Sequence, residues 1–187
     1  MPKRPPGKLR VIGGQWRSRL IEFDAADGVR PTPDRVRQTV FDWLAPIIPG
    51  ARCLDLFAGS GALGIEALSR GAASCTFVET GARPSLSIKA ALLALKAEHP
   101  DVVTMDAIYY VTQTWHRYHI VFCDPPFDTD LLARALPELP KILMPDSNRI
   151  YLEWPEGRAP ALPAGFSLVR EKQAGLVCFG LATYRHP

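Results

Sequence analysis

Residues 124–127, with the sequence Asp-Pro-Pro-Phe, carry the side chains that most directly suggest chemistry. They follow an apolar segment at 119–123 that is typical of a buried β-strand. Two consecutive prolines fix the backbone, so the Asp124 carboxylate and the Pro125 carbonyl can accept both N–H bonds of one amino group. Phe127 can stack on the ring that carries this group. Two acceptors favour a pyramidal nitrogen whose lone pair points at an incoming methyl group, so the motif fits methylation of an exocyclic amine.

A second motif, Gly-x-Gly-x-x-Gly, is formed by Gly59, Gly61 and Gly64. It lies between a predicted strand and a predicted helix, where glycines permit a tight turn and let a ligand lie against bare backbone. Glu79 ends the next strand, 20 residues after Gly59, where a carboxylate can accept ribose hydroxyl hydrogens. The pattern by itself suits the adenosine of NAD as well as that of S-adenosylmethionine.

Two further carboxylates favour the methyl donor. Asp55 ends the strand before the glycine turn, where it would attract a cationic methionyl group and repel a pyrophosphate. Asp106 ends the third strand, where it could accept from an adenine amino group. Each has a plainer alternative, because Asp55 could close the loop and Asp106 could be the N-cap of a helix.

Alternating strands and helices would position both motifs. The predicted strands are at 52–57, 75–79, 102–105, 119–123 and 149–153, and helices at 61–70, 84–97, 107–115 and 129–136 separate them. Repeated β-α units imply a parallel sheet with helices on both faces, and ligands bind beyond the carboxyl ends of its strands. The fourth strand would flank the first, so Asp124 and the glycine loop would face one crevice. Two final segments, 166–173 and 176–184, predict an antiparallel hairpin at one edge.

The first 19 residues carry six basic side chains and no acidic one, although the net charge of the whole chain is only +3. Short β-like segments at 9–12 and 17–23 predict a hairpin or small β extension. The charge asymmetry suggests a polyanionic partner, because phosphate contacts release counterions, and a solvated basic tail is the alternative. Thr32 and Pro33 then predict a helix over 33–45, with Thr32 as its N-cap.

The length of 187 residues and the 47% hydrophobic content suit one globular domain. No run of about 18 apolar residues predicts a transmembrane helix, and no apolar segment follows the basic N-terminus, so we expect a cytoplasmic location. The four cysteines form no Cys-x-x-Cys pair, and we expect them to be buried free thiols.

Together, the motifs resemble those of the RsmD family, the bacterial 16S rRNA guanine-N2 methyltransferases within the class I S-adenosylmethionine-dependent enzymes. The resemblance covers nearly the whole chain and rests on residues 10–17, 28–37, 55–70 and 121–127. It implies an α/β, Rossmann-like class I methyltransferase fold. The sheet would be seven-stranded and mostly parallel, with a C-terminal antiparallel hairpin and a small N-terminal β extension.

The resemblance also implies roles for individual residues. The target guanine would be flipped into a pocket and held by Asp124, Pro125 and Phe127. The residues expected to bind S-adenosylmethionine are Asp55, Phe57, Gly59, Gly61, Glu79 and Asp106. The stretch around Arg30 would lie near the cofactor and the opening of the substrate pocket.

We therefore predict a basic arm with a hairpin extension at 1–30 and an S-adenosylmethionine-dependent methyltransferase domain at 31–187. We expect a monomer without a metal ion, which acts on 16S rRNA in the assembled or assembling small ribosomal subunit. The residues predicted to bind RNA are Lys3, Arg4, Lys8, Arg10, Arg17, Arg19, Arg30, Arg35 and Arg37.

Three other functions compete with this interpretation. A DNA adenine-N6 methyltransferase shares the Asp124 motif, but 187 residues leave little room for a separate sequence-reading domain. An NAD-dependent oxidoreductase would use the glycine loop but not the Asp124 motif. A non-catalytic RNA-binding module would bind RNA without a cofactor and would tolerate loss of Asp124.

Overall fold

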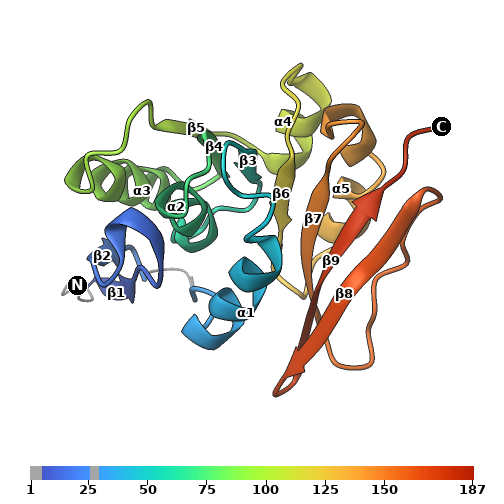
Figure 1. Cartoon of the computed structure of the whole chain (residues 1–187), viewed down its shortest axis with the longest axis horizontal. Coiled ribbons are helices and arrows are strands. Elements are labelled where there is room, and N and C mark those ends of the chain that lie inside the picture. The colour runs from blue at the N-terminus through green and yellow to red at the C-terminus, as the bar shows by residue number, and fades with distance from the viewer. Residues whose placement is uncertain (1–5, 26–29) are drawn as a thin grey trace.

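A seven-stranded sheet forms the centre of the protein, seen in a computed structural model that describes residues 6–25 and 30–187. Its strands are β3 (Arg52–Asp55), β4 (Ser74–Glu79), β5 (Asp101–Thr104), β6 (Ile120–Cys123), β7 (Arg149–Pro155), β8 (Phe166–Ala174) and β9 (Val177–Tyr184). They lie in the order β5-β4-β3-β6-β7-β9-β8 (Figure 1). The first five strands of this order pair in parallel, and β9 pairs antiparallel with both β7 and β8. The predicted class I methyltransferase fold, with its C-terminal hairpin, is confirmed.

The strand order reverses at β3, which has β4 on one side and β6 on the other. The register of β3 and β6 pairs Asp55 with Phe122, and the Leu56 N–H donates to the Phe122 carbonyl over 3.0 Å. The prediction that the strand before Asp124 flanks the strand before the glycine loop is therefore confirmed. Such a reversal opens a crevice at the carboxyl ends of the two strands, where ligands of open α/β sheets bind.

Helices cover both faces of the sheet. The helices are α1 (Asp34–Leu44), α2 (Ala62–Ser69), α3 (Ala82–Ala94), α4 (Ala107–Gln113) and α5 (Leu131–Ala135), with a short 3-10 helix, η3 (Leu139–Ile142). One buried cluster joins α1, α2 and α3 to strand residues such as Cys53, Phe122 and Tyr151. A second cluster joins α4, α5 and η3 to the alternate strand residues, such as Leu54 and Val121. This period of two places the side chains of each strand on opposite faces.

The N-terminal residues form a separate two-stranded antiparallel sheet of β1 (Gly7–Arg10) and β2 (Leu20–Phe23), joined through a 3-10 helix, η1 (Gly14–Trp16). This sheet lies beside α2 and α3 (Figure 1). Its inward side chains, including Leu9, Trp16 and Ile21, belong to the same buried cluster as α2 and α3. The predicted β extension is confirmed, and it is packed on the domain through a shared core.

Two smaller observations complete the fold. Cys53, Cys75 and Cys123 are buried free thiols as expected, whereas Cys178 is only half-buried. Among the described residues, no helix is both long enough and apolar enough to cross a membrane.

Candidate active site

Two carboxylates brace the glycine loop between β3 and α2. The Gly64 N–H donates to Oδ2 of Asp55 over 2.9 Å, and the Gly59 N–H donates to Oε2 of Glu79 over 2.8 Å. Gly59 and Gly61 have φ angles of 53° and 77°, a left-handed conformation that favours glycine. Asp55 thus makes the loop-closing contact that was the plainer alternative for it, and Glu79 ties β4 to the same turn.

Gly64 allows α2 to lie close against the sheet. A Cβ atom at this position would come within 2.3 Å of the Phe77 ring and 2.8 Å of the Cys75 sulfur. Both of these residues lie on β4, so a larger side chain would push α2 away from that strand. The third glycine of the motif therefore sets the distance between the helix and the sheet, while the first two shape the turn.

Asp124, directly after β6, presents an acceptor that is unpaired within the described ranges 6–25 and 30–187. Its Oδ1 atom is buried and has no hydrogen-bond partner among the described residues. Pro125 is buried, whereas the ring of Phe127 is 38% exposed and so is open to a stacking partner. Buried polar atoms are nearly always satisfied, so an orphaned carboxylate oxygen points to a donor that a ligand supplies. The three predicted catalytic residues thus offer one acceptor and one exposed ring at a single strand end.

Three carboxyl groups lie at or near the carboxyl ends of neighbouring strands, with Glu153 two residues before the end of β7. Burial raises the pKa of Asp55 to about 7, although the hydrogen bond from Gly64 lowers it. Burial, with the charges of Asp55 and Glu153, raises the pKa of Asp124 well above its usual range. Burial also raises the pKa of Glu153, against hydrogen bonds from Tyr151 and Thr32. A cation or N–H donors placed among these carboxyl groups would stabilise their ionised forms.

This charge pattern distinguishes between the two cofactors. The N–H groups of Gly59 and Gly64, which could have held a pyrophosphate, already donate to carboxylates. A dinucleotide would therefore meet negative charge where it needs donors, whereas the sulfonium and ammonium groups of S-adenosylmethionine would meet acceptors. The residues at the crevice fit the methyl donor and disfavour NAD.

The two other predicted cofactor residues lie at the same edge of the sheet. Asp106 is the N-cap of α4, because its Oδ1 accepts from the Tyr109 N–H over 2.8 Å, as in the plainer alternative. Phe57 is half-buried two residues after the end of β3 and packs against the cluster under α4 and α5. Contacts of these two residues with the cofactor stay predictions.

Comparisons with known proteins agree with the geometry. The family model described as "Conserved hypothetical protein 95" matches residues 9–183. Ribosomal RNA small subunit methyltransferase D of Escherichia coli (strain K12) is 46% identical over 177 residues, covering 94% of this chain and 89% of that protein. The chain belongs to the RsmD family.

Another relative and a solved structure match over similar lengths. Ribosomal RNA small subunit methyltransferase D of Haemophilus influenzae is 38% identical over 181 residues, covering 94% of this chain and 93% of that protein. The solved structure of yhhF from Escherichia coli superposes with a TM-score of 0.87 and 44% identity, covering 97% of this chain and 100% of that one. As an RsmD-family member, the chain is an S-adenosylmethionine-dependent rRNA methyltransferase.

The predicted RNA-binding residues divide into three groups. Lys3 and Arg4 lie outside the described residues. The exposed members are Lys8, Arg10, Arg17, Arg19, Arg30 and Arg35. Arg37 is only 1% exposed, and its guanidinium donates to Glu66, to Asp34 and to the carbonyls of Arg10 and Thr32. The assignment of Arg37 to RNA binding was therefore wrong, because internal partners hold this side chain in the core.

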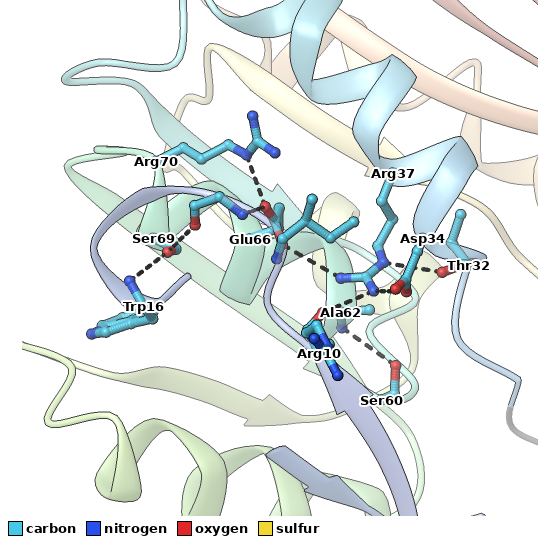
Figure 2. Close-up of polar contacts among 12 residues, drawn as sticks. Arg10, Trp16, Thr32, Asp34, Arg37, Ser60, Ala62, Glu66, Ser69 and Arg70 are labelled. Atoms are coloured by element: carbon cyan, nitrogen blue, oxygen red, sulfur yellow. Dashed lines mark hydrogen bonds and ion pairs between the residues drawn. The ribbon is translucent and has the colours of Figure 1, made fainter. Parts of the chain in front are cut away.

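Sequence reasoning missed the residue at the centre of that network. Glu66 is fully buried on α2 and accepts from the N–H groups of Ile12 and Gly13 and from the side chains of Arg37 and Arg70 (Figure 2). These donors come from the N-terminal extension, from α1 and from Arg70, the residue directly after α2. An acidic residue on an otherwise apolar helix was the available signal, and its partners lie too far away in the sequence to be inferred from spacing.

Sequence reasoning also missed Glu153, and it misplaced Thr32. The N-cap of α1 is Pro33, and the Thr32 hydroxyl instead donates to Oε1 of Glu153 over 3.3 Å. This contact ties the segment before α1 to β7, next to the strand that carries Asp124. The sequence did mark Glu153 as the last residue of a predicted strand, which is the position where site residues of such sheets are found.

Proposed function

We propose that this chain transfers a methyl group from S-adenosylmethionine to the exocyclic N2 amine of a guanine in 16S rRNA of the small ribosomal subunit. The observation that carries the proposal is the buried Oδ1 atom of Asp124, which no described residue hydrogen-bonds and which lies beside the braced glycine loop. A reaction on ribosomal RNA would take place in the cytoplasm, where bacterial ribosomes assemble.

The residues around Asp124 would prepare the amine for transfer. When bound, S-adenosylmethionine supplies an electrophilic methyl group. Asp124 and the Pro125 carbonyl accept hydrogen bonds from the two N–H groups of the amine, and Phe127 stacks on the base, so the nitrogen lone pair is directed into the crevice. Asp124 need not remove a proton before transfer, because the proton can leave after the nitrogen has become cationic. Catalysis would then come mainly from positioning and from electrostatic stabilisation.

Transfer of tritium tests the proposal directly. Small subunits and naked 16S rRNA, both from a strain that lacks the gene, are incubated with the protein and labelled S-adenosylmethionine. We expect label in the RNA, and nucleoside analysis should identify it as N2-methylguanosine. Label in N6-methyladenosine would instead favour the adenine alternative, and absence of label from both substrates would contradict the proposal.

The exposed basic residues of the N-terminal extension would bind the phosphates of the substrate. Removing the whole extension is an unsuitable test, because Leu9 and Trp16 belong to the main core. Replacing Lys8, Arg10 and Arg17 together by glutamine should weaken RNA binding and reduce the salt dependence of the binding constant, by about 0.7 to 0.9 in slope per lost phosphate contact. Filter binding over a series of salt concentrations measures this slope.

A matched control uses Arg117. This exposed residue lies before the start of β6, whereas Asp124 follows the other end of the same strand. Arg117→Gln should leave the salt dependence unchanged, and the affinity for S-adenosylmethionine should be the same in all variants. An unchanged slope in the triple variant would show that these side chains do not contact RNA.

A further inference from the structure

The Asp124 motif alone does not identify the base. Guanine, adenine and cytosine each carry a planar amino group, and each such group can donate two hydrogen bonds. The bases differ at the neighbouring ring nitrogen, because N1 of guanine carries a hydrogen, whereas N1 of adenine and N3 of cytosine are acceptors. A second acceptor beside Asp124 would therefore select guanine.

Glu153 stands where this second acceptor is needed. The parallel register of β6 and β7 pairs Phe122 with Tyr151 and Cys123 with Leu152, so the next residues, Asp124 and Glu153, lie at the same level. Neighbouring strands are about 4.8 Å apart. Phe122 and Tyr151 both belong to the buried cluster under α1 and α2, and alternation directs the side chains two residues further along to that same face.

The Glu153 carboxylate is held in one orientation. Its Oε1 atom accepts from the Tyr151 hydroxyl over 2.5 Å and from the Thr32 hydroxyl over 3.3 Å. Its Oε2 atom accepts no hydrogen bond from any residue that the structure describes. Within the described part of the chain, one oxygen is therefore anchored by two donors, from β7 and from the segment before α1, and the other is available to a ligand. The Tyr151 ring is itself fixed, because it is buried and contacts the Phe122 ring at a centroid distance of 6.3 Å.

We propose that Glu153 is the specificity-determining residue, which accepts a hydrogen bond from the N1–H of the target guanine while Asp124 and the Pro125 carbonyl accept hydrogen bonds from its N2 amine. Tyr151 and Thr32 are positioning residues that orient Glu153. This inference rests on the proposed guanine-N2 activity. Adenine would place the lone pair of its N1 against a carboxylate, so the acceptor would be left unpaired and the wrong base would be rejected.

The test uses 2-aminopurine, which keeps the 2-amino group of guanine but lacks its N1 hydrogen and its O6 oxygen, so the comparison between the wild-type protein and the Glu153 variant isolates the contribution of N1. Small subunits are reconstituted with 16S rRNA that carries guanine or 2-aminopurine at the position that the wild-type protein methylates. The wild-type protein should prefer guanine about 100-fold in kcat/KM, because loss of the N1–H leaves the carboxylate without a donor.

Glu153→Gln should remove this preference. Glutamine has the same shape, its Oε1 can still accept from Tyr151 and Thr32, and its amide nitrogen replaces the acceptor Oε2 by a donor. Transfer to guanine should fall about 10- to 100-fold, whereas transfer to 2-aminopurine should be unchanged or faster. The control is Glu156→Gln, which changes an exposed glutamate three residues beyond and should retain the wild-type preference.

The outcomes separate this inference from the proposed function. If Glu153→Gln retains the wild-type preference for guanine, the inference is overturned and the guanine-N2 activity stands. If the wild-type protein does not methylate guanine at N2, both are overturned. Tyr151→Phe, which removes only the hydroxyl, should reduce the preference about 3- to 10-fold without changing the affinity for S-adenosylmethionine. This variant decides the question if Glu153→Gln binds the cofactor poorly.

Discussion

Asp124→Asn should reduce methyl transfer about 100- to 1000-fold at saturating substrate, because removal of one preorganised electrostatic contact to a reacting group has effects of this size. Asparagine retains the shape of the side chain but replaces the charged acceptor by a weaker one. Binding of S-adenosylmethionine should persist, since Asp55 and Glu79 still brace the glycine loop. Single-turnover transfer measures the first effect, and calorimetric titration measures the second.

The same substitution should make the protein more stable at neutral pH. The pKa of Asp124 is raised in the folded protein, chiefly by burial. Between the ordinary carboxyl pKa and this raised value, the folded state holds more protons than the unfolded state, so stability falls as pH rises. Asp124→Asn removes this cost, which we expect to be about 1 to 3 kcal/mol at pH 8 and absent near pH 4. Thermal melts at the two pH values test the sign.

Asp146→Asn is the matched control. Asp146 is exposed in the loop before β7, at the amino ends of the parallel strands, whereas Asp124 lies at their carboxyl ends. It should change neither transfer nor the pH dependence of stability. An Asp124→Asn protein that turns over at the wild-type rate would refute the assigned role of Asp124. A loss of stability at pH 8 would refute the argument that its buried charge is costly in the absence of substrate.

The parts of the site that could be predicted are those determined by local sequence. The glycine turn and the Asp124 motif each occupy a few consecutive residues, and the apolar segments before them are typical of buried strands. The adjacency of β3 and β6 followed from the topology of repeated β-α units. These features required no knowledge of a contact between distant side chains.

Predictions for single polar residues failed where a distant partner decides the outcome. Thr32 has the type and position of a helix N-cap, yet its hydroxyl bonds to Glu153, 121 residues away. Arg37 belongs to a basic stretch, yet Glu66 on another helix holds it in the core. Asp55 and Asp106 make the local hydrogen bonds that carboxylates at such positions usually make, so their contacts with the cofactor stay predictions.

Glu66→Ala should lower the free energy of unfolding by about 3 to 5 kcal/mol, the cost of breaking a buried ion pair and leaving its partner uncompensated. Arg37 would lose one of its two carboxylate partners, and the N–H groups of Ile12 and Gly13 would lose their acceptors. At this chain length the change corresponds to a fall of about 10 °C in Tm. Glu98→Ala, at an exposed glutamate, is the control and should leave Tm unchanged.

The loss should be concentrated in the N-terminal extension, since Glu66 joins this segment to α2 (Figure 2). In Glu66→Ala, hydrogen exchange at the Ile12 and Gly13 amides should accelerate far more than exchange in β3 or β6. Because the exposed basic residues are carried by the extension, RNA affinity should fall more than affinity for S-adenosylmethionine. Uniform acceleration across the sheet would show instead that Glu66 supports the whole domain, and that docking of the extension is not its particular role.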